Sequence, residues 1–85
     1  MISELKETCD LMTSSDYKER FIAEYEQLRI RIVKLENMIK DFHEGSLPFT
    51  PSCPVELLED QLDAMKDYKN VLEQRASIEG ISLNQ

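Results

Sequence analysis

Three basic side chains stand close together in the first half of the chain, at Arg29, Arg31 and Lys34, and no acidic residue separates them. Guanidinium and ammonium groups bind phosphate oxygens, since Arg offers paired hydrogen bonds and Lys a point charge. Arg29 and Arg31 are two positions apart and therefore point to different sides of a helix. The cluster predicts phosphate binding where two copies of the chain meet. Its alternative role is ion pairing between copies, with the acidic second half of the chain.

Aromatic and further basic side chains extend this candidate site. Tyr17, Tyr25 and Tyr68 offer rings that can stack on a nucleobase, and each also fits a helix seam as a packed or hydrogen-bonded residue. Two more arginines add positive charge elsewhere in the chain. The predicted ligand-binding residues are Tyr17, Arg20, Arg29, Arg31, Lys34, Tyr68 and Arg75.

Other residues that could carry chemistry have structural interpretations. Four acidic residues between positions 59 and 67 indicate a solvated helix face, because no loop supplies carbonyl ligands for a cation. His43 is expected to stabilise the C-terminus of a helix. A Cys53–His43 nucleophile would lack a third group and an oxyanion loop. We therefore expect no catalytic residue, no metal site and no cofactor, in a protein that is not an enzyme.

The 85 residues carry a formal net charge of −7, which argues against binding of a nucleic-acid polymer. Residues 16–43 contain six basic and six acidic side chains, whereas residues 54–79 contain three basic and seven acidic ones. An anionic ligand would therefore meet the first segment, and a basic protein surface the second. No signal peptide or apolar run long enough for a membrane span is visible, so we expect a soluble, cytoplasmic protein with reduced thiols.

Apolar spacing predicts a long helix over residues 15–43. Seven apolar residues recur in steps of four and three, a heptad pattern typical of a helix that packs on another helix. This seam consists of Phe21, Tyr25, Leu28, Ile32, Leu35, Ile39 and Phe42. Asp16 is placed to cap the start of the helix, with Glu19 at capping spacing, and Gly45 is placed to end it. A short amphipathic helix over residues 1–13 is expected to precede it.

A proline-containing loop over residues 44–53 separates this helix from a second one over residues 54–79. Ser52 or Cys53 is the expected N-cap, and Gly80 ends the helix before a tail over residues 80–85. The seam of this helix consists of Leu58, Leu62, Met65, Leu72 and Ala76, with Lys69 as a polar gap. The predicted fold is a single all-α domain, residues 1–85, built on a long antiparallel helical hairpin.

Apolar residues outside the first seam indicate that one chain does not cover all of its own apolar surface. Ile22, Ile30, Val33 and Met38 lie off the seam and would form an exposed stripe too large for a monomer. We therefore expect self-association into a homo-oligomeric helical bundle.

Three stretches, YKERFIAEYEQL, CPVELLEDQLDAMKDY and LEQRASIEGI, resemble small proteins encoded by bacteriophages and prophages of low-GC Gram-positive bacteria. The order of a helix, a short loop with Cys-Pro and a second helix also resembles the helical hairpin of phage sponges that counter the CBASS and Thoeris defences. Those sponges are homo-oligomers that hold cyclic oligonucleotides or cyclic ADP-ribose isomers between subunits without cleaving them.

The resemblance implies a phage counter-defence protein that sequesters a signalling cyclic nucleotide in an infected bacterial host. Two other functions remain open at this point. An acidic inhibitor of the anti-CRISPR type would use the second helix to cover a basic groove on its partner. A structural or adaptor coiled coil would need only the two apolar seams.

Overall fold

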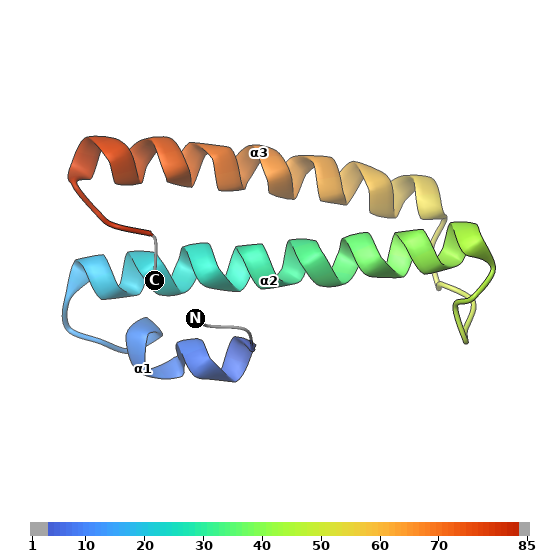
Figure 1. Ribbon diagram of the computed structural model, residues 1–85, viewed down its shortest axis with the longest axis horizontal. Coiled ribbons are helices and arrows are strands. Elements are labelled where there is room, and N and C mark those ends of the chain that lie inside the picture. The colour runs from blue at the N-terminus through green and yellow to red at the C-terminus, as the bar shows by residue number, and fades with distance from the viewer. Residues whose placement is uncertain (1–3, 84–85) are drawn as a thin grey trace.

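The computed structural model describes residues 4–83. A 3₁₀ helix η1 (Leu5–Thr8) leads directly into a short helix α1 (Cys9–Met12), and two long helices follow, α2 (Tyr17–Glu44) and α3 (Val55–Glu79) (Figure 1). The described part of the chain contains no strand. The prediction of an all-α chain is therefore confirmed.

Helix α2 begins and ends at the residues that suit those positions. The Asp16 side chain accepts a hydrogen bond from the Lys18 backbone N–H at 2.9 Å, which satisfies one of the open donors of the first turn. Glu19 accepts a hydrogen bond from the Ser14 hydroxyl. At the other end Gly45 has φ 73°, a left-handed conformation that costs glycine little, and its N–H donates to carbonyls of the last turn.

Helix α3 starts without a side-chain cap. Its N-cap is Pro54, so the expectation of Ser52 or Cys53 in this position was wrong. Pro54 has an extended ψ of 141°, and its carbonyl accepts the first helical hydrogen bonds, from the Leu57 and Leu58 N–H groups at 3.1 and 3.4 Å.

Gly80 ends helix α3 with φ 71°, and the Ile81 N–H donates to the Ala76 carbonyl at 2.9 Å. This is the hydrogen bond of a Schellman ending, and it directs Ile81 back into the protein, where it is buried.

Helices α2 and α3 lie side by side and run in opposite directions (Figure 1). Polar pairs between the two helices agree with the antiparallel order: the later a residue stands in α2, the earlier its partner stands in α3. These pairs are Tyr17–Glu79, Tyr25–Glu73, Glu36–Lys66 and His43–Glu59.

The core lies between the two long helices, and the tail after α3 completes it. Its buried members are Phe21, Tyr25, Leu28, Ile32, Leu72, Ala76 and Ile81. Two members of the expected α2 seam differ: Leu35 is only partly buried, and the Phe42 side chain is 39 % exposed. Ile39, which lies between them in the seam, is buried, so the seam is covered unevenly toward the loop end.

The N-terminal segment covers a second side of α2. Thr8 is fully buried there, and the Gln27 amide donates to its hydroxyl at 2.8 Å. Ala23 and Ile30 lie one turn from Gln27 on the same side of α2 and are buried as well. The expectation that Ile30 is left uncovered by its own chain was therefore wrong. The segment contains two short helical pieces between residues 5 and 12; part of the helix expected over 1–13 lies outside the described residues.

Candidate functional site

An open groove lies along one side of the contact between α2 and α3. It has a volume of about 310 Å³ and a largely apolar floor. The lining residues come from three elements: Leu5 of η1; Arg31, Lys34, Leu35 and Met38 of α2; Gln61 and Met65 of α3. We call it the Gln61 groove.

Two cations at the Gln61 groove have no ion-pair partner among the residues that the structure describes. These are Arg31 and Lys34, and both side chains are exposed. Gln61 adds an exposed amide, whose nearest partner is the Met65 sulfur at 3.7 Å. The groove therefore combines positive charge, an amide that can both donate and accept hydrogen bonds, and an apolar surface.

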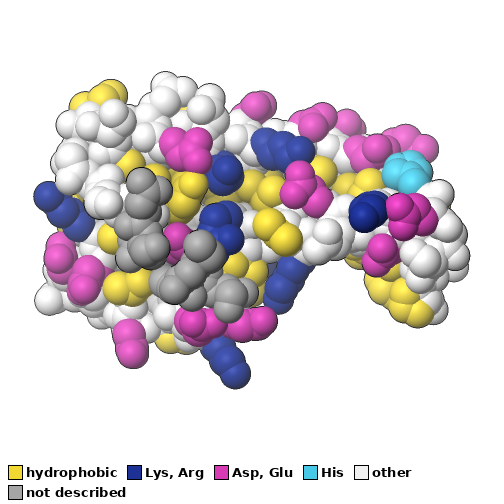
Figure 2. All heavy atoms as spheres, viewed as in Figure 1, with side chains coloured by type: hydrophobic (Ala, Val, Ile, Leu, Met, Phe, Trp, Pro, Cys, Tyr) yellow, Lys and Arg dark blue, Asp and Glu magenta, His cyan; other side chains and the backbone are white. Residues whose placement is uncertain are grey.

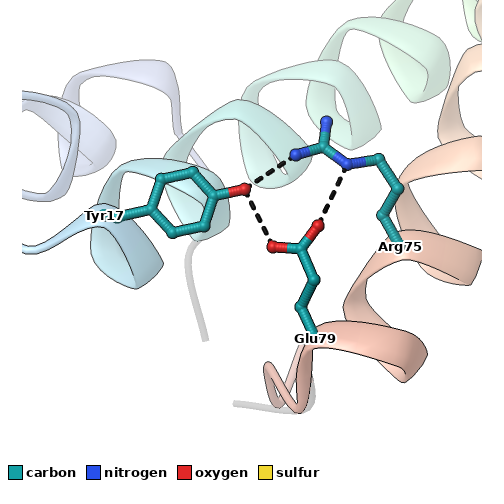
Figure 3. Close-up of polar contacts among 3 residues, drawn as sticks. All are labelled: Tyr17, Arg75 and Glu79. Carbon is teal, nitrogen blue, oxygen red and sulfur yellow. Dashed lines mark hydrogen bonds and ion pairs between the residues drawn. The ribbon is translucent and has the colours of Figure 1, made fainter.

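A polar cluster stands at the end of the helix pair where α2 begins and α3 ends (Figure 3). The Arg75 guanidinium donates to the Tyr17 hydroxyl at 2.7 Å, and Tyr17 donates to Glu79 at 2.9 Å. Arg75 also pairs with Glu79 at 3.3 Å and lies 4.9 Å above the Phe21 ring. Desolvation lowers the pKa of Arg75, but the hydrogen bond to Glu79 and the nearby Tyr17 and Glu79 outweigh it, and the pKa lies above its ordinary value.

Helix periodicity connects this cluster to the Gln61 groove. Residues seven apart return to nearly the same side of a helix. Gln61, Tyr68 and Arg75 therefore lie on one side of α3, just as Tyr17 and Arg31 lie on one side of α2. Tyr17 contacts Arg75 at one end of the helix pair, and Arg31 lines the groove with Gln61 further along. The two helix sides therefore face the same way. Five of the seven predicted ligand-binding residues lie along this side of the helix pair: Tyr17, Arg31, Lys34, Tyr68 and Arg75.

Arg29 does not belong to this set. It lines a second groove of about 330 Å³ with Lys66 and Lys69, whereas Arg31 lines the Gln61 groove. The structure therefore does not bring Arg29 and Arg31 together within one chain. The Arg29 guanidinium lies 2.7 Å from the carboxylate of Glu26, which is buried. This ion pair lies within α2. Arg29 therefore has a carboxylate partner in its own chain, whereas the sequence suggested ion pairing between copies as an alternative role.

The second groove is balanced in charge. Lys66 lies 2.9 Å from Glu36, and Lys69 lies 3.5 Å from Glu73. Figure 2 shows a face of the molecule on which basic side chains alternate with acidic and hydrophobic ones along the α2–α3 contact. A bound anion would have to compete with carboxylates here, so we regard the second groove as a structural region rather than a ligand site.

Arg20 lies apart from both grooves. Its guanidinium donates to the Ser14 carbonyl at 2.8 Å and holds the turn between α1 and α2. Conversely, Gln61 and the apolar groove residues were absent from the sequence-based set. Gln61 could have been found, since it stands seven residues before Tyr68 and fourteen before Arg75.

Within residues 4–83, no group of three or more His, Cys, Asp or Glu side chains is placed to hold a metal ion. The same part of the chain has no helix that meets the length and hydropathy required to cross a membrane.

The family named Sequestin matches residues 15–78, which include both long helices almost completely and all seven predicted ligand-binding residues. No curated protein and no solved structure matched the chain. The family match covers well over half of the 85 residues. The chain therefore belongs to the Sequestin family.

Proposed function

We propose that this protein sequesters a signalling cyclic nucleotide, or a related cyclic ADP-ribose compound, between subunits of a homo-oligomer and does not cleave it. The family name suggests sequestering of a ligand. The observation that carries the proposal is the presence of Arg31 and Lys34, without ion-pair partners among residues 4–83, above the apolar floor of the Gln61 groove. In a phage-infected bacterium, removal of such a signal would counter a host defence.

The groove chemistry suits the parts of a cyclic nucleotide. Arg31 and Lys34 offer charge-assisted hydrogen bonds to phosphate oxygens. The Gln61 amide can donate to and accept from the edge of a base, and Leu35, Met38 and Met65 provide apolar contact for its faces. Tyr68, 44 % exposed on the same side of α3, offers a further stacking surface.

The size of the groove supports a ligand that is shared between copies. Its volume of about 310 Å³ is at the lower end of small-molecule sites, which typically bury most of their ligand in about 300–1,000 Å³. The groove is also open along the helix pair. A cyclic dinucleotide would therefore extend beyond one chain, and a second subunit would cover the rest.

The lining residues support storage rather than turnover. None of the seven is a Ser, Cys, His, Asp or Glu, which are the usual nucleophiles and general bases for phosphodiester or glycosidic chemistry. Arg31 and Lys34 are suited to charge neutralisation, and Gln61 to recognition. We therefore include the absence of enzymatic activity in the proposal.

The test is thermal shift and calorimetry with a panel of cyclic di- and trinucleotides and cyclic ADP-ribose isomers. We expect at least one of these to stabilise the protein. Arg31→Ala and Lys34→Ala should each weaken its binding about 10- to 100-fold, because each removes a charged hydrogen bond worth about 1.5–3 kcal/mol. Lys40→Ala, an exposed cation that does not line the groove, is the matched control. No response to any member of the panel would contradict the proposal.

Acidic side chains along the side of α3 that faces away from α2 support a second candidate function (Figure 2). Such a surface favours rapid association with a basic partner, as an anti-CRISPR-type inhibitor would require. Charge reversal of Glu59, Asp60 and Asp63 would abolish that activity and leave nucleotide binding unchanged. The opposite pattern in the Arg31 and Lys34 variants separates the two functions.

A further inference from the structure

Helix α3 carries a second row of heptad-spaced residues that its own chain leaves exposed. The row advances in steps of four and three, as in a coiled-coil seam, and lies beside the row that packs on α2. Its members, which we call the outer row, are Leu57, Gln61, Ala64, Tyr68, Val71, Arg75 and Ile78, and all are exposed. Leu57 is 57 % exposed, Val71 51 % and Ile78 86 %, although each is a residue type that favours burial.

The outer row is nearly symmetric about Tyr68. If a second α3 runs antiparallel with Tyr68 at the crossing point, side chains of compatible type face each other along the whole row. Leu57 meets Ile78, Gln61 meets Arg75, Ala64 meets Val71, and Tyr68 meets Tyr68. A twofold axis requires this property, since each contact must occur twice with the roles of the two copies exchanged.

Charge selects the antiparallel orientation. Residues 55–67 contain five acidic side chains and one basic side chain, whereas residues 68–79 contain two of each. A parallel pair would place the two acidic halves together, while an antiparallel pair places each acidic half against a neutral half.

We propose that two copies of this chain pair through the outer rows of α3, antiparallel, around a twofold axis at Tyr68. The pairing brings Arg75 of the second copy to Gln61, beside the groove of Arg31 and Lys34. Its charge is already balanced by Glu79 of its own copy, and its hydrogen bonds within that copy use Nε and Nη2, so Arg75 would contribute Nη1 as a further hydrogen-bond donor. This inference deepens the proposed function, because it names the surface that completes the site, but its tests need no ligand.

The first test uses cysteine cross-linking in a Cys9→Ser/Cys53→Ser background. Protein carrying Leu57→Cys is mixed with tagged protein carrying Ile78→Cys and then oxidised. Antiparallel pairing predicts disulfides between positions 57 and 78, and few between two copies of position 57. Ser77→Cys, exposed on another side of α3, is the control and should cross-link slowly with itself. Preferred 57–57 disulfides, or none above the Ser77→Cys level, would overturn the proposal.

The second test measures assembly by sedimentation. A Tyr68→Lys/Val71→Lys variant should be a folded monomer, with a dimer dissociation constant raised at least about 30-fold, because both changes place charge at the centre of the contact. The control Asn70→Lys/Ser77→Lys adds the same charge on another side of α3 and should remain dimeric. A monomeric parent protein, or a dimeric Tyr68→Lys/Val71→Lys variant, would contradict the pairing. A dimer that binds no nucleotide would retain the pairing and reject the proposed function.

Discussion

Arg29 and Arg31 are neighbours in sequence but have different surroundings. Arg29 pairs with Glu26, whose side chain is only 4 % exposed, whereas Arg31 stands at the Gln61 groove. A buried carboxylate needs a cation or several donors, because its ionised form is costly away from water. Arg29 therefore has a structural role first, and we assign ligand recognition to Arg31.

Arg29→Met should lower the free energy of unfolding by about 1–3 kcal/mol, since the buried Glu26 carboxylate loses its charged partner. Arg31→Met should change it by less than about 0.5 kcal/mol, as expected of an exposed site. Urea unfolding of the two variants measures the difference. Adding Glu26→Gln to Arg29→Met should restore part of the loss. Equal stability of the two single variants would show that the pair with Glu26 contributes nothing.

Tyr25 has a polar role inside the core. Burial and the hydrogen bond to Glu73, 2.7 Å long, raise the pKa of the Tyr25 phenol to about 12. Its ring is therefore committed to the core and is not available to stack on a ligand, which leaves Tyr17 and Tyr68 as the exposed tyrosines.

The shifted pKa of Tyr25 predicts a loss of stability in alkali. The folded chain keeps this proton up to about pH 12, whereas an unfolded tyrosine loses it near pH 10. The stabilisation is therefore fully present below pH 10 and declines as the pH rises toward 12. Urea unfolding at pH 9 and pH 11 should show a smaller decline for Tyr25→Phe than for the parent. Identical declines would place the Tyr25 hydroxyl in an ordinary aqueous environment.

At the scale of elements, the ends of the long helices were predictable because single residues determine them. Asp16, Gly45 and Gly80 each occupy the position expected from the sequence. The N-terminal segment was less predictable. Its path depends on contacts with the far side of α2, such as the hydrogen bond between Thr8 and Gln27, and apolar periodicity over a dozen residues does not specify such contacts.

Gly80 and Gly45 provide a matched pair for the role of the tail after α3. Both have φ near +70°, so an alanine at either position costs about 1–2 kcal/mol in local strain. Gly80 also positions the buried Ile81, whereas Gly45 leads into an exposed loop. Gly80→Ala should therefore lower the melting temperature more than Gly45→Ala does. Equal effects would indicate that the Ile81 contact is independent of the helix ending.

At the scale of the whole molecule, the sequence predicted the all-α class and the core side of α2 but not the site as a whole. Heptad spacing identified the residues from Phe21 to Ile32 that pack on α3, since periodicity reports which side of a helix is apolar. The site was harder to predict, because its members come from three elements. The sequence grouped Arg29 with Arg31 by proximity, and the folded chain separates them.

Coverage of α2 by the N-terminal segment also changes the argument for assembly. Ile30 is buried within one chain, so it gives no reason for a second copy. Ile22 and Met38 are partly buried, and Val33 stays 45 % exposed as expected. The larger group of exposed apolar side chains lies in the outer row of α3. The case for self-association therefore moves from the first long helix to the second.

The most direct test of sequestration is capture followed by recovery. The protein is incubated with each cyclic di- or trinucleotide and cyclic ADP-ribose isomer, the free compound is measured after ultrafiltration, and the protein is then denatured by heat. We predict that one compound disappears from the filtrate in proportion to the protein and returns after heating with its mass unchanged. Recovery of a cleaved product, or a filtrate that retains every compound in full, would contradict sequestration.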